Sequence, residues 1–246
     1  MKIINWLGPI AFLAAVISTL GYRFGFIHFR LSLLVFGLSL LVCMLVVLAG
    51  IFKLVVCLLK KQRFPIELAP LVLACALIPI LTFYNVGAGA FGAAMIHDIT
   101  TDMDNPPAFV FIRPDDGFRI NSLIYPGEEF SAIQRSAYPD IKTFVTPLPP
   151  RRVFQKAVFA GRLLSWEIIA KDFAGLRYEA VAKTQLFGFI DDISVRVTPL
   201  ADGGSAVDLR SMSRVGITDL GANAKRIRRF LAELEAALEQ ELINLQ

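Results

Sequence analysis

Cysteine and histidine are almost absent from the carboxy-terminal part of this 246-residue chain, which excludes several kinds of active site. Residues 97–246 contain no cysteine and one histidine, His97, whereas all three cysteines lie nearer the amino terminus. A Ser-His-Asp triad, a Cys-His pair and a Cys/His zinc site each lack their parts there. A disulfide framework is excluded as well. No glycine-rich phosphate-binding loop joins a strand to a helix, and no cofactor is expected.

Acidic residues are nearly missing from the first 96 residues, which hold seven Lys or Arg and a single acid, Glu67. Residues 97–246 hold 18 Lys or Arg against 20 Asp or Glu. The positive net charge therefore belongs to the amino-terminal part, and the rest of the chain is close to neutral. Because a nucleic-acid-binding domain needs a basic patch on its folded surface, nucleic acid is not expected as a partner.

Three long apolar runs without charge cover residues 3–22, 31–52 and 68–96. A helix needs roughly 20 residues to cross about 30 Å of hydrocarbon. We therefore predict a membrane anchor over residues 1–96, with helices at about 3–22, 31–55 and 68–94, and the lipid bilayer as a partner. A cleaved signal peptide is the alternative for the first run, but the run is long and two more follow. No charged residue lies mid-membrane, which is typical of an anchor and not of an ion pathway.

Basic residues in the loops indicate which way the helices cross the membrane. The side with the second loop carries Lys2, Lys53, Lys60, Lys61 and Arg63, and the other side carries Arg23 and Arg30. The side richer in Lys and Arg is usually cytoplasmic. Three crossings then place the carboxy-terminal domain outside the cytoplasm.

Residues 97–150 are rich in Pro and Gly and are predicted to form a linker and an irregular extended segment, with a helical turn near 131–137. His97, Asp98 and Asp102 are weak candidates for metal ligands, because oxygen-rich loops hold hard cations. The segment lacks the Gly and the terminal Glu of an EF-hand loop. A solvated linker that ends at Pro106 and Pro107 is the other interpretation.

Residues 151–246 have the pattern of an α-β4-α core, and residues 97–246 together form one domain. An apolar helical pattern at 151–164 is followed by four alternating runs that predict an antiparallel meander. A long helix follows at about 220–245, with Asp219 as its N-cap and an apolar stripe from Leu220 to Leu245. The predicted fold is thus a membrane-anchored α+β fold: three transmembrane helices, a four-stranded antiparallel meander and a long C-terminal helix.

Charges of alternating sign occupy the other face of the predicted strands. They are Arg177, Glu179, Lys183, Asp192, Arg196, Asp208 and Arg210. Opposite charges on neighbouring strands form cross-strand pairs, so we expect ion pairs on a solvated face.

Polar residues gather where the predicted strands end and the last helix begins. The candidates for ligand binding are Asp191, Asp192, Arg210, Ser211, Ser213, Arg214, Asp219, Asn223 and Arg226. The cationic start of the last helix favours an anionic ligand. The same residues have a second interpretation, in which their hydrogen bonds lock the junction between strand and helix.

The run from Glu179 to Asp192 and the run from Asp208 to Phe230 closely resemble the family known as domain of unknown function 1499. The segments 97–102, 106–109 and 137–141 and Trp166 resemble it as well. The three apolar helices look like those of proteobacterial members. The resemblance implies an envelope protein without an assigned activity. Together with the three apolar runs and the loop charges, it leads us to expect a multi-pass protein of the bacterial inner membrane with a periplasmic carboxy-terminal domain.

Three classes of function fit these observations. The leading hypothesis is a non-catalytic module in envelope maintenance that binds an envelope protein or an anionic small ligand. The second is an envelope hydrolase that uses carboxylates such as Asp191 or Asp219 as acid and base. Adjacent strand residues point to opposite faces, so Asp191 and Asp192 are not expected to act together. The third is an accessory protein for lipid handling or transport.

Overall fold

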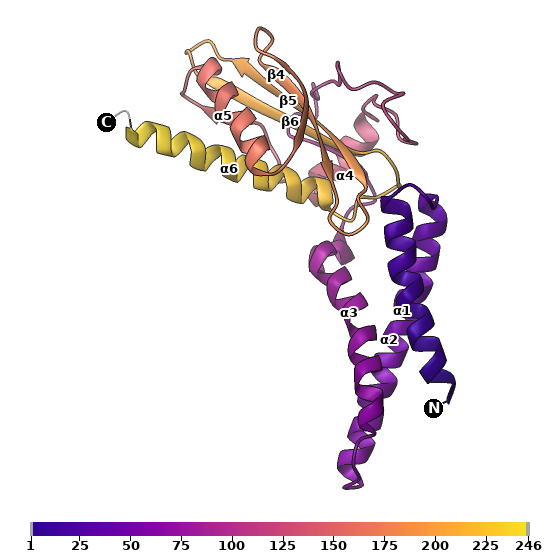
Figure 1. Cartoon of the computed structure of the whole chain (residues 1–246). Coiled ribbons are helices and arrows are strands. Elements are labelled where there is room, and N and C mark those ends of the chain that lie inside the picture. Colours follow the sequence, from indigo (N-terminus) through magenta and orange to yellow (C-terminus); the bar gives the residue numbers. More distant parts are fainter. Residues whose placement is uncertain (1, 245–246) are drawn as a thin grey trace. The chain divides into compact units, whose positions relative to one another are not determined.

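The structure is a computed structural model that describes residues 2–244, with side chains from Trp6 to Glu239. The chain divides into two compact units (Figure 1). The first contains the residues up to Ala88 together with the loop Gln185–Gly188. The second contains Gly89–Thr184 and the residues from Phe189 onward. The second unit therefore includes both the predicted linker and the predicted core.

The first unit consists of three helices that are each long and apolar enough to cross a membrane, as predicted. They are α1 (Lys2–Arg23), α2 (Phe29–Leu59) and α3 (Ala69–Val86), and the short 3₁₀ helix η1 (Ile66–Leu68) precedes α3. Helix α3 ends eight residues before the expected boundary at 94, because Gly87 adopts a positive φ of 82° and stops it. A second 3₁₀ helix, η2 (Ala88–Gly92), follows.

Small residues allow these helices to approach one another closely. A Cβ atom on Gly8 would lie 2.6 Å from Leu71, and one on Gly50 would lie 2.6 Å from Val72. The hydroxyl of Ser32 donates a hydrogen bond to the carbonyl of Ser18 at 2.7 Å. Close packing through Gly and Ser is typical of helices that associate within a bilayer.

The second unit contains a six-stranded antiparallel sheet, whereas the alternation pattern predicted four strands. The strands are β1 (Asp98–Thr100), β2 (Phe144–Thr146), β3 (Glu167–Asp172), β4 (Arg177–Lys183), β5 (Ile190–Pro199) and β6 (Ser205–Ser213). Their order is β1-β6-β5-β4-β3, and β2 also pairs with β6. The two strands missed from the sequence have three residues each, too few to show an alternation of period two.

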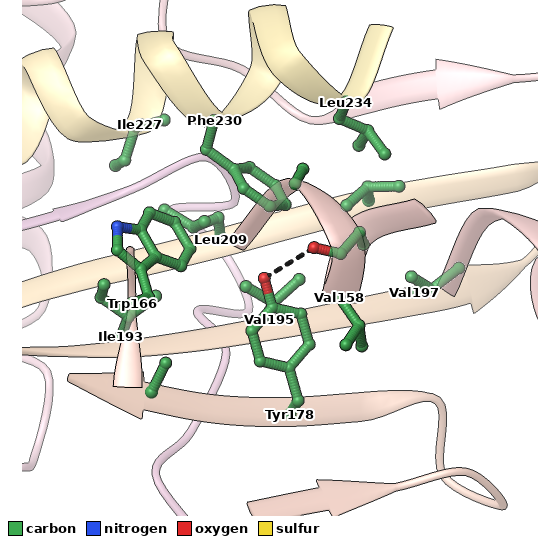
Figure 2. Packing of buried hydrophobic residues seen from close by; sticks show 14 of the residues in the cluster. Val158, Trp166, Tyr178, Ile193, Val195, Val197, Leu209, Ile227, Phe230 and Leu234 are labelled. Carbon is green, nitrogen blue, oxygen red and sulfur yellow. Dashed lines mark hydrogen bonds between the residues drawn. The ribbon is translucent and has the colours of Figure 1, made fainter. Parts of the chain in front are cut away.

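Helices α5 (Pro150–Leu163) and α6 (Ala222–Asn244) cover one face of the sheet, as Figures 1 and 2 show. The indole of Trp166 stacks on Phe230 with 5.3 Å between ring centroids. The Tyr178 hydroxyl donates to the carbonyl of Ala157 at 3.0 Å. This apolar layer is the core that positions the start of α6.

The apolar stripe predicted for the last helix is confirmed in its middle part. Ala224, Ile227, Leu234 and Leu238 are buried, and so is Phe230, which was not assigned to the stripe. Leu220 is exposed, and the predicted Leu242 and Leu245 lie outside the described side chains.

The other face of the sheet is solvated only in part, contrary to the prediction, because its central charges are buried while Lys183 is exposed. Residues 101–127, here called the strap, run across it without a helix or strand (Figure 1), and the helix α4 (Glu128–Ala137) follows. Glu179 and Asp192 are fully buried beneath the strap, and Asp208 and Arg210 are nearly so. These four charges therefore form a buried layer that the strap covers.

Candidate functional site

The nine predicted ligand-binding residues lie near the meeting ends of β5 and β6, but they divide between the two faces of the sheet. Side chains at successive positions of a strand point to opposite faces. The six that take part in contacts between the sheet and α6 are Asp191, Ser211, Ser213, Asp219, Asn223 and Arg226. The three on the face beneath the strap are Asp192, Arg210 and Arg214. The structure therefore contains two clusters in place of one predicted site.

Asn223, which is fully buried, is at the centre of the first cluster. Its Nδ2 donates to the carbonyl of His97 and to Oγ of Ser213, both at 3.0 Å. Its Oδ1 accepts from Oγ of Ser211 at 2.7 Å and from Nη1 of Arg226 at 2.5 Å. One amide thus joins the last strand, the first turn of α6 and the residue before β1.

Two carboxylates complete the first cluster. Asp191 pairs with Nη2 of Arg226 at 2.5 Å. Asp219 accepts hydrogen bonds from the backbone N–H groups of Gly221 at 2.8 Å and Asn223 at 2.7 Å, so its side chain caps the first turn of α6. The helix begins at Ala222, however, so Asp219 lies earlier in the chain than the predicted N-cap position. Burial raises the pKa of Asp219, and the two N–H groups oppose that shift. These contacts are those of a lock between strand and helix, and ligand binding here stays a prediction.

The second cluster contains one fully buried carboxylate, that of Asp192, between two guanidinium groups. Its Oδ1 accepts from Nε and Nη2 of Arg214 at 2.9 and 2.7 Å, and its Oδ2 accepts from Nη1 of Arg119 at 2.8 Å. Arg214 also donates to the carbonyl of Asp116 in the strap. Asp192 therefore ties the strap to β5 through Arg119 and to the residue after β6 through Arg214.

Arg210 and Asp98 form a buried two-pronged ion pair beside this cluster. Nε and Nη2 of Arg210 donate to the two carboxylate oxygens at 3.0 and 2.7 Å. The guanidinium carbon lies 4.9 Å from the ring centroid of Phe109 and 5.3 Å from that of Tyr125, within the range of cation–π attraction. Burial raises the pKa of Asp98, and the hydrogen bonds from Arg210 lower it. Arg210 also donates to the strap carbonyl of Leu123 at 3.0 Å.

The weak metal candidates His97, Asp98 and Asp102 are not brought together. Between Trp6 and Glu239, no group of three or more His, Cys, Asp or Glu residues is arranged to hold a metal ion. Asp102 pairs with Arg196 at 2.9 Å. The ring of His97 lies against Phe130, and burial lowers the pKa of His97. The three candidates thus have different main partners: Phe130 for His97, Arg210 for Asp98 and Arg196 for Asp102.

The sequence did not single out Glu179 and Arg119 as site residues. Both oxygens of Glu179 accept backbone N–H groups of the strap, from Val110, Phe111 and Ile112. Glu179 lies between Tyr178 and Ala180 in a strand that is otherwise apolar from 178 to 182, and this is a signal of burial. Arg119 stands in an irregular segment, where no pattern marks it.

The carboxylates of both clusters already have cationic or backbone partners. A general acid and a general base must face a common substrate from suitable distances. Asp191 and Asp192 point to opposite faces, as predicted, and each pairs with a different arginine. Asp219 uses both of its oxygens to cap a helix. The arrangement provides fixed ion pairs and hydrogen bonds, which hold segments together.

These features define a protein with three apolar helices that can span a membrane and an α+β domain stiffened by buried ion pairs. The family model described as "Protein of unknown function (DUF1499)" matches residues 98–234, which is more than half of the chain. The chain therefore belongs to this family, as the sequence resemblance indicated.

Comparisons with curated proteins and with solved structures add nothing about the function of the chain. No curated protein matches the chain. Among solved structures, the crystal structure of Ara h 8.0201 is similar over 40% of this chain and 95% of that chain, with 17% identity and a TM-score of 0.31. The structure of TTHA0849 from Thermus thermophilus is similar over 42% of this chain and 96% of that chain, with 15% identity and a TM-score of 0.25. These scores are too low to carry an argument.

Proposed function

We propose that this chain is a multi-pass protein of a bacterial inner membrane whose α+β domain lies in the periplasm and binds an envelope protein without catalysing a reaction. Three apolar helices support the anchoring. The excess of Lys and Arg on one side of them supports the orientation. The envelope setting rests on the resemblance to proteobacterial members of the family.

One observation carries the binding role: buried charges pin the strap to the sheet while apolar side chains point outward from it. Glu179 holds the strap backbone at Val110 and Ile112, and Arg210 holds it at Leu123. Phe118 and Ile124 are exposed, Ile124 to 80%. A segment that is already ordered loses little conformational entropy on binding, and exposed apolar side chains favour a protein partner.

The charges of the domain favour a protein partner over an anionic small ligand. Arg210, Arg214 and Arg226 each already pair with a buried carboxylate. An anion that bound one of them would leave that carboxylate buried without its counter-charge, which costs about 3–5 kcal/mol. The arginines therefore act within the domain, and the exposed apolar side chains of the strap contact the partner.

The two alternative functions, an envelope hydrolase and a lipid-handling protein, have less support than the binding role. A hydrolase would need a free carboxylate, and the raised pKa of Asp219 is the one observation in its favour; yet that side chain caps α6. A lipid carrier would need space beside the sheet for an acyl chain. That space is filled by Trp166, Phe230 and Leu234, packed as a close core (Figure 2).

A photo-crosslinking amino acid at Phe118 or Ile124, in the full chain in its native membrane, tests the binding role. We expect both positions to form an adduct of one discrete mass with a protein. Val145 is the matched control, because it is apolar, 63% exposed and outside the strap. The absence of adducts at 118 and 124, or the same adducts at 145, contradicts the proposal.

A reporter fused after Gln246 tests the orientation separately. Alkaline phosphatase is active only outside the cytoplasm. Green fluorescent protein fluoresces in the cytoplasm but not after export through the general secretion route. We expect phosphatase activity without fluorescence. The opposite result would place the domain in the cytoplasm and would remove every periplasmic partner from consideration.

A further inference from the structure

Exposed apolar side chains surround the place where the chain enters the second unit. Phe91 is 90% exposed and Ile217 is 74% exposed, and Met95 and Leu220 are exposed as well. They come from two segments, residues 89–96 and 216–221, here together called the apolar rim. Such side chains on a folded domain mark a surface that another apolar phase covers.

Hydrogen bonds and packing join the two segments into one surface. Oγ1 of Thr218 donates to the carbonyl of Ala94 at 3.2 Å, and the N–H of Asp219 donates to the carbonyl of Ile96 at 3.3 Å. A Cβ atom on Gly221 would lie 3.7 Å from Cβ of Ala93. Two segments that are far apart in the chain therefore lie side by side.

The apolar rim has little charge, which suits contact with an apolar phase. Leu220 has a positive φ of 53°, which is uncommon for a residue other than Gly. Its apolar side chain is exposed. Asp219 is the only charged residue within 89–96 and 216–221. Its carboxylate accepts two backbone N–H groups at the start of α6. The rim thus carries no free charge to oppose contact with lipid.

The short link to α3 and two nearby basic residues favour the lipid bilayer as the phase that covers the apolar rim. Helix α3 ends at Val86, and Phe91 follows five residues later, so the two cannot lie more than about 18 Å apart at 3.6 Å per residue. Lys225 and Arg229 are exposed, four residues apart on one side of the first turns of α6. Basic residues beside an apolar surface are attracted to anionic headgroups.

We propose that the apolar rim inserts into the interfacial zone of the bilayer, with Phe91, Ile217 and Leu220 among the upper acyl chains and Lys225 and Arg229 at anionic headgroups. The domain is then held at the membrane by two contacts, its covalent link to α3 and its own surface. This inference rests on the membrane anchoring proposed above, but not on the orientation or on the protein partner.

Fluorescence quenching by lipids tests the proposal in the full chain. The fluorophore NBD is attached at one introduced cysteine, Ile217→Cys, Val145→Cys or Leu73→Cys, after Cys43, Cys57 and Cys75 are replaced by Ala. The protein is placed in vesicles of phosphatidylethanolamine and phosphatidylglycerol that contain a lipid with a doxyl quencher near the headgroup end of its acyl chain. Leu73, an exposed residue of α3, reports the anchoring, and Val145 reports an exposed apolar position outside the rim.

We expect the labels at 217 and 73 to lose most of their emission to the quencher, and the label at 145 to keep its emission. A label at 217 that behaves like the one at 145, while 73 is quenched, overturns the rim proposal and leaves the anchoring intact. A label at 217 that is shielded in detergent and untouched by the lipid quencher indicates a protein occupant and also overturns it. An unquenched label at 73 refutes the anchoring itself.

Discussion

Replacing Glu179 by Gln should loosen the strap while leaving the volume of the side chain unchanged. In the wild-type chain, the N–H of Val110 donates to one carboxylate oxygen at 2.5 Å and the N–H of Ile112 donates to the other at 2.7 Å. Gln keeps one oxygen and places an amide NH₂ group where the second oxygen was. One backbone N–H then loses its acceptor and faces another donor in a buried position.

The magnitude follows from these contacts. A hydrogen bond to a charged group contributes about 1.5–3 kcal/mol, and a buried donor left without an acceptor costs about 1–3 kcal/mol. We therefore expect the Glu179→Gln variant to favour opening of the strap by about 2–4 kcal/mol. At 1.4 kcal/mol for each factor of ten, the opening equilibrium rises roughly 30- to 700-fold.

Hydrogen–deuterium exchange of the full chain measures this change directly, because amide exchange in a folded protein reports local opening. Peptides that contain residues 110–112 should exchange faster in the variant by that factor. Glu167→Gln is the matched control: Glu167 is exposed and lies 3.7 Å from Nζ of Lys183, a contact worth at most about 1 kcal/mol. Exchange of the strap should be unchanged in this control.

If peptides over 110–112 exchange at the wild-type rate in Glu179→Gln, the buried carboxylate does not hold the strap. If Glu167→Gln accelerates them as much, loss of a negative charge anywhere on the sheet explains the effect. Either result would also remove the observation that carries the proposed binding role.

Three further predictions concern the core, the helix cap and the single histidine of the domain. Phe230→Ala should lower the free energy of unfolding by about 3–5 kcal/mol, measured by denaturant titration, whereas the half-exposed Phe159→Ala should lower it by much less. Asp219→Ala should lower it by about 0.5–2 kcal/mol through loss of the cap, seen as a lower midpoint of thermal unfolding. Burial lowers the pKa of His97 below 6.5, so the folded state disfavours the charged imidazole. Stability should therefore be retained above about pH 6.5 and decline as the pH falls below it, and His97→Gln should flatten the melting temperature between about pH 5 and 7; an unchanged slope would contradict this assignment.

Periodicity predicted the parts of the fold that have a long regular pattern. The three apolar helices, the strands β4, β5 and β6 and the middle of α6 were all legible, because each repeats its pattern over many residues. Strands β1 and β2 were not, since three residues cannot show a period. Their place in the sheet depends on pairing with β6, which is distant in sequence.

The buried charges show why a pattern of alternating sign is ambiguous. Arg196 and Asp208 pair across β5 and β6, as opposite charges do on a solvated face. In this domain, unlike on a solvated face, the strap lies over these charged residues. The strap has no periodicity that would predict its path. The candidate residues lie near the ends of β5 and β6, and their role in ligand binding stays a prediction. Their partners were not predictable, because Arg119 and the carbonyl of Leu123 come from that same irregular segment.

The pairing of β1 with β6 bears on how the protein is made. Asp98 lies twelve residues after the end of α3, and its partner Arg210 stands 112 positions further along the chain. A ribosome that has just synthesised the third helix has thus delivered one edge of the sheet but not the strand that must pair with it. Until Arg210 has been synthesised, Asp98 has no counter-charge and β1 has no neighbour. Any truncation before that residue leaves a polypeptide in which β1 cannot join the sheet.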